Sequence, residues 1–151
     1  MSGRRVTATL VGQYEHALEA RNRLFIPARF REHLAARRAV LTLGLDGCLF
    51  LYPETAWGTL TARLRQQADS TPDMRAFVRV FFSHAFPVEL DRQGRILIPQ
   101  TLLGLAGIRR EAVIIGVNDR VEIWGRERWA AYRRRAQGTY MTTAKRLAVN
   151  I

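Results

Sequence analysis

Few side chains in this sequence have the types and spacing that catalysis or metal binding requires. The cysteine and histidine inventory is small, comprising Cys48, His16, His33 and His84, and its spacing matches no pattern of metal ligands. Neither a phosphate-binding glycine loop nor a nucleophile elbow occurs. Glu19 and Asp91 could form a pair of carboxylates, but each stands where a tight turn needs an acidic residue. We therefore expect no catalytic residue, no metal site, no cofactor and no small-molecule substrate, and we expect that the chain is not an enzyme.

The charge of the chain points to a polyanion as partner. Lysine and arginine together number 24 against 13 aspartate and glutamate residues, which gives a net charge of +11 and a pI near 11.4. Lys145 is the only lysine, so nearly every positive charge is a guanidinium, the group that best matches phosphates and guanine edges. A GC-rich genome would favour arginine equally, so this feature carries little weight. A basic surface that merely keeps the protein soluble is the alternative, and bulk charge does not decide between the two.

Three features of the sequence favour the cytoplasm. The chain has a single cysteine, which excludes an intrachain disulfide. No apolar run approaches the ~20 residues that span a membrane. Residues 1–12 lack the apolar core of a signal peptide. We expect a cytoplasmic protein with no membrane partner.

The sharpest local motif is the segment 90–99, with the sequence LDRQGRILIP. Asp91 can open a turn because its short carboxylate accepts the backbone amides that follow. Gly94 fits the left-handed position that ends a type I turn with a bulge, and Arg95 then leaves the turn at the base of the next strand. Taken alone, these residues describe any tight hairpin in which Asp91 and Arg95 brace the turn.

A related pattern occurs 72 residues earlier in the chain. Without any gap, this shift places Arg23 on Arg95, Ile26 on Ile98 and Pro27 on Pro99. Further matches are the pairs Arg37-Arg38 with Arg109-Arg110, Gly44 with Gly116, and Trp57 with Trp129. A gap-free register over about forty positions that includes turns, proline and tryptophan is a poor fit to chance matching of a biased composition. We infer an internal duplication.

Each copy is predicted to form the same small unit of strands and one short helix. Alternating apolar residues predict strands, and the proline after the second strand suits the first turn of a helix. Asp46-Gly47 forms a strong hairpin turn, and Asn118-Asp119 stands in the equivalent place. The predicted elements are strands 14–18 and 86–90, strands 24–26 and 96–98, helices 28–35 and 100–107, strands 39–45 and 112–117, and strands 48–52 and 121–124.

Helices are predicted between the two copies and after the second one. The first begins near Glu54, and Asp69-Ser70-Thr71-Pro72 ends it, with Thr71 as the N-cap of the next helix. That second helix carries an apolar face that we expect to be buried, made of Met74, Phe77, Val78, Phe81 and Phe82. A last helix from about Arg126 turns inward Trp129, Tyr132 and Ala136, and we expect little order after Gly138. These apolar faces are expected to form core or subunit contacts, not a cofactor pocket.

A unit of about 45 residues buries too little surface to be stable alone. Two related copies in one chain can share a core about a pseudo-two-fold axis, as a homodimer would. The expected fold is therefore α+β and β-rich, with connecting and C-terminal helices. The expected division is a first unit over 13–56, a helical connector over 57–84, a second unit over 85–128, and a C-terminal helix with a basic tail over 129–151.

The turn motif, the helix after it and their duplication resemble a known family. The segment 90–99 is similar to the hairpin-plus-helix signature of the AbrB-like swapped-hairpin DNA-binding superfamily, also called SpoVT-AbrB. Two copies in one chain, with Tyr14-Glu15-His16 opening the first and the sequence GLDGCL at 44–49, resemble the MraZ family from about Gly12 to Trp129. The resemblance implies a transcriptional regulator that binds repeated sites on double-stranded DNA upstream of the bacterial division and cell-wall gene cluster, including its own gene. It also implies ring-shaped homo-oligomers and association with the nucleoid.

The acidic residue and the arginine of the family motif correspond here to Asp91 with Arg95 and to Glu19 with Arg23. The first copy departs from the motif twice, because Glu19 replaces aspartate and Asn22 replaces glycine. Asn is the next most tolerant residue at positive φ, whereas the longer Glu19 must make its turn bond differently or more weakly. The arginines expected to contact phosphates and base edges are Arg21, Arg23, Arg29, Arg31, Arg92 and Arg95.

Two other classes of function are alternatives to the regulator. A protein-interaction module of the same superfamily, such as an antitoxin, is the main alternative, but such modules usually have one copy of the unit and an acidic tail. This chain has two copies and a basic tail. An enzyme is the other alternative, and the scarcity of catalytic groups argues against it.

Overall fold

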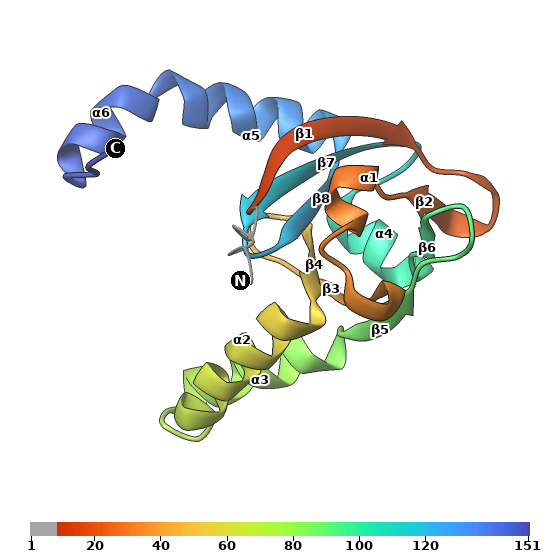
Figure 1. The fold of residues 1–151 in the computed structure, drawn as a ribbon. Coiled ribbons are helices and arrows are strands. Elements are labelled where there is room, and N and C mark those ends of the chain that lie inside the picture. Colours follow the sequence, from red (N-terminus) through yellow and green to blue (C-terminus); the bar gives the residue numbers. More distant parts are fainter. Residues whose placement is uncertain (1–8) are drawn as a thin grey trace, which may run out of the picture.

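The computed structural model describes residues 9–151, so most of the segment on which the signal-peptide expectation rests lies outside the described residues. The centre of the molecule is a six-stranded antiparallel sheet (Figure 1). Its strand order is β1-β7-β8-β4-β3-β5. The strands are β1 (Leu10–Ala17), β3 (Arg38–Leu43), β4 (Leu49–Pro53), β5 (Phe86–Glu89), β7 (Glu111–Asn118) and β8 (Val121–Gly125).

The two copies exchange strands in this sheet. Strand β1 of the first copy pairs with β7 of the second, and β3 of the first pairs with β5 of the second. At the centre, β4 pairs with β8 so that Phe50 lies opposite Glu122, its equivalent 72 residues on. Leu49 faces Ile123 and Leu51 faces Val121, and the same shift interchanges these pairs. The register thus fixes the predicted pseudo-two-fold axis between β4 and β8, and the swapped-hairpin fold is confirmed.

A two-stranded ribbon forms a second sheet, made of β2 (Arg23–Phe25) and β6 (Arg95–Leu97). Helices α1 (Ala28–Arg31) and α4 (Gln100–Ala106) follow these strands and, with them, cover one face of the large sheet. Between these two layers lies the main core, in which Leu24, Ile26, Ile98 and Leu102 are completely buried.

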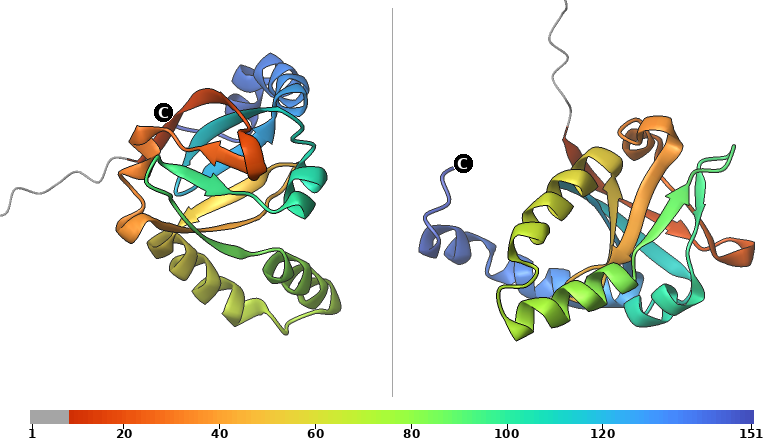
Figure 2. Two further views of the ribbon diagram at one scale, coloured as in Figure 1. Left: turned by 90° about the vertical axis from the view of Figure 1, so that its right-hand side faces the viewer. Right: turned by 90° about the horizontal axis from the view of Figure 1, so that it is seen from below.

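The opposite face of the large sheet carries a second, aromatic core. Strand residues alternate between the two faces, so Leu49 and Leu51 enter the first core while Phe50 and Tyr52 enter the second. Two helical arms cover this face in part: α2 (Glu54–Gln67) with α3 (Pro72–Ser83), and α5 (Arg126–Gly138) with α6 (Tyr140–Arg146). The arms leave the sheet at the side away from the ribbon and diverge from each other (Figures 1 and 2). No helix within residues 9–151 has the length and apolar character needed to cross a membrane.

Helix boundaries agree with the local signals at the first arm. Helix α2 begins at Glu54, and Pro72 opens α3. The hydroxyl oxygen of Thr71 accepts a hydrogen bond from the amide of Met74 at 3.0 Å, as expected for an N-cap. At the β3–β4 turn, Asp46 and Gly47 adopt the predicted positive φ values of 62° and 87°.

Four expectations were wrong in detail. Helix α1 ends at Arg31 and not near residue 35; the second copy has Gly107 at φ 64° to cap α4, whereas the equivalent residue here is Ala35. The segment after Gly138 is ordered: it forms α6, which bends away at the end of α5, and the residues after it line one groove with Tyr132. Ala136 of α5 is exposed. The apolar face of α3 is only partly covered, since Phe77 is 41% exposed and Phe81 alone is buried.

Candidate nucleic-acid interface

The ribbon places the two copies of the motif side by side at one end of the molecule (Figure 2). Leu24 pairs with Ile96 at its centre, and both side chains point into the main core. Because side chains alternate along a strand, the neighbouring positions face outward, and they carry Arg23, Phe25, Arg95 and Leu97. Cross-copy hydrogen bonds tie the ends, from the Ile26 amide to Gly94 O and from the Ile98 amide to Asn22 O, each at 2.9 Å.

The turn of the second copy has the predicted geometry. Asp91 Oδ1 accepts the backbone amides of Gln93 at 2.9 Å and Arg95 at 3.0 Å. The amide of Gly94, at φ 82°, donates to the Asp91 carbonyl at 3.1 Å. The hydrogen bond from the Arg95 amide, with further bonds from the Arg95 side chain and the Gln93 amide, lowers the pKa of Asp91. A carboxylate that is ionised at neutral pH therefore holds this turn closed.

The turn of the first copy is built differently. Its chain makes a short 3₁₀ turn over Ala20–Asn22, in which Arg21 and Asn22 have φ values of 64° and 60°. The expectation that Asn22 takes the left-handed position is confirmed, and its side-chain amide donates to Gln100 Oε1 at 3.1 Å. Glu19 makes no side-chain bond to the backbone of its own turn. The first turn therefore keeps only the backbone bond that both copies share, from the Glu19 amide to the Arg23 carbonyl at 2.8 Å and from the Asp91 amide to the Arg95 carbonyl at 2.9 Å.

Charged side chains cross between the two turns. Arg95 donates from Nε to Asp91 Oδ2 and from a terminal nitrogen to Glu19 Oε1, both at 2.9 Å. Its other terminal nitrogen donates to Gln93 Oε1. The bond to Glu19, together with that to Asp91, raises the pKa of Arg95. Arg23 has a looser ion pair, with 3.9 Å between its guanidinium and Asp91 Oδ2.

The six arginines expected at a DNA interface fall into three groups. Arg21, Arg29 and Arg92 are exposed. The side chain of Arg23 is 37% exposed, whereas that of Arg95 is 18% exposed and held by its ion pairs.

Arg31 forms the third group and serves packing. Its guanidinium lies 5.1 Å from the centre of the Phe25 ring. A Cβ built on Gly94 would be 2.7 Å from one of its terminal nitrogens. Arg31 thus covers the turn of the second copy instead of projecting into solvent.

Two further arginine pairs lie beside the turns, where the sequence analysis did not place DNA contacts. The carbonyls of Arg110 and Arg37 accept hydrogen bonds from the amides of Leu18 and Leu90, at 2.7 and 2.8 Å. Each leucine directly precedes a turn, so each arginine pair stands at the base of the other copy's hairpin. Arg109 also lines a hollow with Asn22 and Gln100. The recurrence of Arg-Arg at the spacing of 72 residues was the signal that could have identified them.

No constellation of groups for metal binding is present within residues 9–151, where no three His, Cys, Asp or Glu side chains come together. Cys48 is completely buried and its thiol donates to the Leu45 carbonyl at 3.2 Å. Burial raises the pKa of this thiol far above its ordinary range, which keeps it protonated and unreactive.

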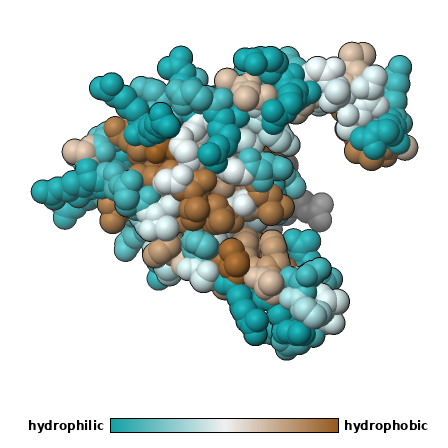
Figure 3. Space-filling model, turned by 180° about the vertical axis from the view of Figure 1, so that it is seen from behind, coloured by the Kyte–Doolittle hydropathy of each residue, from teal (hydrophilic) through white to brown (hydrophobic). Residues whose placement is uncertain are grey.

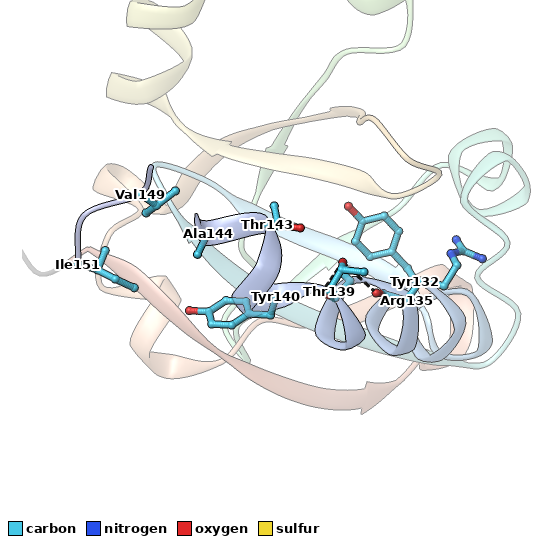
Figure 4. Close-up of a pocket in the computed structure, with 9 residues that line it drawn as sticks. Tyr132, Arg135, Thr139, Tyr140, Thr143, Ala144, Val149 and Ile151 are labelled. Carbon is cyan, nitrogen blue, oxygen red and sulfur yellow. Dashed lines mark hydrogen bonds between the residues drawn. The ribbon is translucent and has the colours of Figure 1, made fainter. Parts of the chain in front are cut away.

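An open, largely apolar groove lies on the second arm, far from the ribbon. Tyr132 and Arg135 of α5 and Tyr140 and Thr143 of α6 line it, with Val149 and Ile151 from the end of the chain (Figure 4). The residues that line this groove include no His, Cys, Asp, Glu or Lys. Figure 3 shows apolar side chains gathered between the two arms, while the end that carries the turns is hydrophilic. The two ends of the molecule thus differ in chemistry.

Comparison with known proteins agrees with this arrangement. The family model of the MraZ protein, whose description also carries the term antitoxin-like, matches residues 9–80 and again residues 81–151. The chain is 49% identical over 137 residues to the transcriptional regulator MraZ of Pelotomaculum thermopropionicum, covering 91% of this chain and 94% of that protein. It is 47% identical to the protein of the same name from Moorella thermoacetica, with 91% and 95% covered. The corresponding protein of Lactiplantibacillus plantarum is 46% identical over 136 residues, with 90% and 96% covered. The family model thus matches each copy of the duplicated swapped hairpin, and the chain belongs to the MraZ family.

Proposed function

We propose that this chain is a transcriptional regulator that binds double-stranded DNA with the β2–β6 ribbon and its two turns. The observation that carries the proposal is the convergence of basic motifs from both copies at one hydrophilic end. Residues 19–31 contain four arginines and one glutamate, and residues 91–103 contain two arginines and one aspartate, giving net charges of +3 and +1. The Arg109-Arg110 and Arg37-Arg38 pairs flank the same end. Such a surface attracts the phosphate backbone and offers guanidinium groups to base edges.

The ribbon gives this surface the rigidity that sequence reading needs. Its inner side chains are locked in the main core, and cross-copy hydrogen bonds fix both turns. Arg23, held by one loose ion pair within the described chain, can exchange that contact for a phosphate or a base at little cost. We propose that the first copy makes the main DNA contact and that the second, with Asp91 and Gly94, is the stiffer support.

Family membership supports the targets and the setting of this activity. We propose that the sites are repeats upstream of the division and cell-wall gene cluster, the chain's own gene included, and that the protein acts in the cytoplasm on the nucleoid. One ribbon contacts few base pairs. Several ribbons on one assembly would bind closely spaced repeats with much higher avidity.

We further propose that the helical arms build a ring-shaped homo-oligomer. Phe77, Val80 and Phe82 on α3 are 41%, 51% and 36% exposed, and the α5–α6 arm carries an apolar groove. Apolar surfaces of this kind mark protein contacts. Because both arms lie away from the ribbon (Figure 1), assembly through them leaves the turns free to meet DNA.

The experiment is fluorescence anisotropy with a labelled duplex from the region upstream of the chain's own gene, beside a shuffled duplex of equal length. We expect preference for the natural duplex, and log affinity that falls with log salt by roughly 0.9 for each phosphate contacted. Light scattering should give the mass of a closed assembly larger than a dimer. Equal affinity for both duplexes would contradict sequence-specific binding. Binding that barely changes with salt would contradict a phosphate-led interface and favour the antitoxin-type alternative. A monodisperse monomer would contradict the ring.

A further inference from the structure

The two arginines that the duplication makes equivalent have unequal surroundings. Every nitrogen of the Arg95 guanidinium donates a hydrogen bond, to Asp91, Glu19 or Gln93. The Arg23 guanidinium, in contrast, makes only the 3.9 Å ion pair to Asp91 with the described residues. The exposed fractions of the two side chains, 18% and 37%, follow the same order.

Three substitutions between the copies account for this difference. Asp91 caps its own turn through Oδ1 and binds Arg95 through Oδ2, whereas the equivalent Glu19 caps nothing in its turn. The freed carboxylate of Glu19 reaches across the pseudo-two-fold axis to Arg95. Gln93, which accepts a bond from Arg95, has Arg21 as its equivalent, and an arginine cannot accept a bond from Arg23. Asn22 in place of glycine completes the altered turn.

We propose that Glu19 is a positioning residue that holds the Arg95 guanidinium within the ribbon, so that the chain offers Arg23 and not Arg95 to DNA. This inference rests on the proposed binding of DNA by the ribbon. It assigns to Glu19, a departure from the family motif, the role of making two symmetry-related arginines unequal. Asp91 does not take that role alone, because Oδ1 accepts the turn amides and Oδ2 binds only Nε of Arg95. Glu19 binds a terminal nitrogen of the guanidinium.

The proposal makes a definite prediction for Glu19→Ala. Removal of the carboxylate frees one terminal nitrogen of Arg95, which can then bind a phosphate. We expect affinity for the upstream duplex to rise on the order of five-fold or more, and the salt slope to steepen by about 0.9 for one added phosphate contact. Glu19→Gln, which keeps an acceptor oxygen without its charge, should fall between the wild type and Glu19→Ala.

Two controls separate this effect from the simple loss of a negative charge. Glu32→Ala removes an exposed carboxylate on the first copy and measures the general gain. In an Arg95→Ala background, Glu19→Ala should raise DNA affinity no more than Glu32→Ala does, because the Arg95 guanidinium that Glu19 would release is absent. Equal gains with and without Arg95, or weaker binding by Glu19→Ala in a protein that still folds, would overturn the proposal.

A measurement without DNA keeps the test independent of the proposed function. The full-length protein is treated with phenylglyoxal and then digested, and mass spectrometry of the peptides assigns the modified arginines. Arg23 should be labelled faster than Arg95 in the wild type. Glu19→Ala should raise the Arg95 rate and leave the exposed Arg92 unchanged. If the wild type bound no duplex, the proposed DNA binding would be wrong. The labelling pattern would still decide whether Glu19 holds Arg95. Equal labelling of Arg23 and Arg95 in the wild type would refute it.

Discussion

The two copies of the duplicated unit reach the same ribbon with different chemistry. In the second copy, Asp91 accepts two backbone amides and Gly94 takes the left-handed position without strain. In the first, Glu19 leaves the backbone uncapped, and two residues with side chains, Arg21 and Asn22, adopt positive φ. The first copy has gained charge where the second has kept turn geometry. Because the two copies share one core, the well-formed turn of the second copy can support the ribbon while the surface residues of the first copy change.

The largest effect should come from residues that both copies contribute to the common core. Leu24→Ala and Ile96→Ala, at the paired centre of the ribbon, should each lower the free energy of unfolding by about 2–5 kcal/mol. Because the copies share one core, each variant should still unfold in a single transition in urea. The matched control is Leu97→Ala, since this neighbour is 58% exposed on the outer face and its loss should change little. Separate melting of one half of the chain would show that the copies are independent.

The next effect concerns DNA binding and compares the equivalent arginines. Arg23→Ala should weaken binding to the upstream duplex by about 1–3 kcal/mol if Arg23 reads a base, with mass and fold unchanged. Arg95→Ala should cost less, because its guanidinium is engaged by Asp91 and Glu19. Anisotropy titrations at one fixed salt concentration give both values. Equal losses would mean that the two copies bind alike.

A smaller effect tests the turn backbones. Gly94→Ala should destabilise the protein by about 1–3 kcal/mol, because φ is 82° and the new Cβ would meet the Arg31 guanidinium. In contrast, Asn22→Gly should be neutral or stabilising by up to about 1 kcal/mol, since glycine adopts positive φ without steric cost. Urea unfolding measures both. Similar destabilisation by the two changes would show that the turns are equally demanding.

The smallest effect is a dependence of stability on pH. Hydrogen bonds in the folded state lower the pKa of Asp91 from its ordinary value of 3.8, so its contribution is present above that value. It is lost as the pH falls from about 4 through the lower folded-state pKa. Asp91→Asn should flatten this part of the stability curve, whereas Glu19→Gln, which removes no cap, should not. Acid unfolding of the three proteins followed by circular dichroism gives the comparison.

The sequence predicted the positions of the strands and helices better than the pairing of the strands. Periodicity and turn residues located the strands, and the 72-residue register implied a two-fold arrangement. Residue spacing does not reveal which strand of one copy pairs with which strand of the other, and the resemblance alone implied the swap. Likewise, the motif identified Glu19 and Arg95, but their contact joins residues 76 positions apart. The basic Arg109-Arg110 pair was visible, yet its place beside the first turn depends on the same exchange of strands.

Local signals also failed where tertiary contacts decide. The sequence after Gly138 predicted little order, but Tyr140, Thr143 and Ala144 of α6 line a groove with residues of α5, and this packing supports the helix. The apolar face of α3 was predicted to be buried, but periodicity reports only which residues lie on one face of a helix. Whether that face meets the same chain or another one is not encoded in spacing.

The exchange of strands also constrains how the chain can fold as it is made. Strand β1 begins at Leu10 and lies opposite Asn118 in β7. When the first copy leaves the ribosome, its first strand therefore has no partner until more than two thirds of the polypeptide has been synthesised. Pairings this distant in sequence form slowly and leave edges open in the meantime. Until then β1 can pair with the β7 of a neighbouring chain whose own β1 is not yet in place, because in the finished fold β7 is paired on both sides. The rate of synthesis and the local concentration of chains therefore decide whether β1 pairs within its own chain or with another.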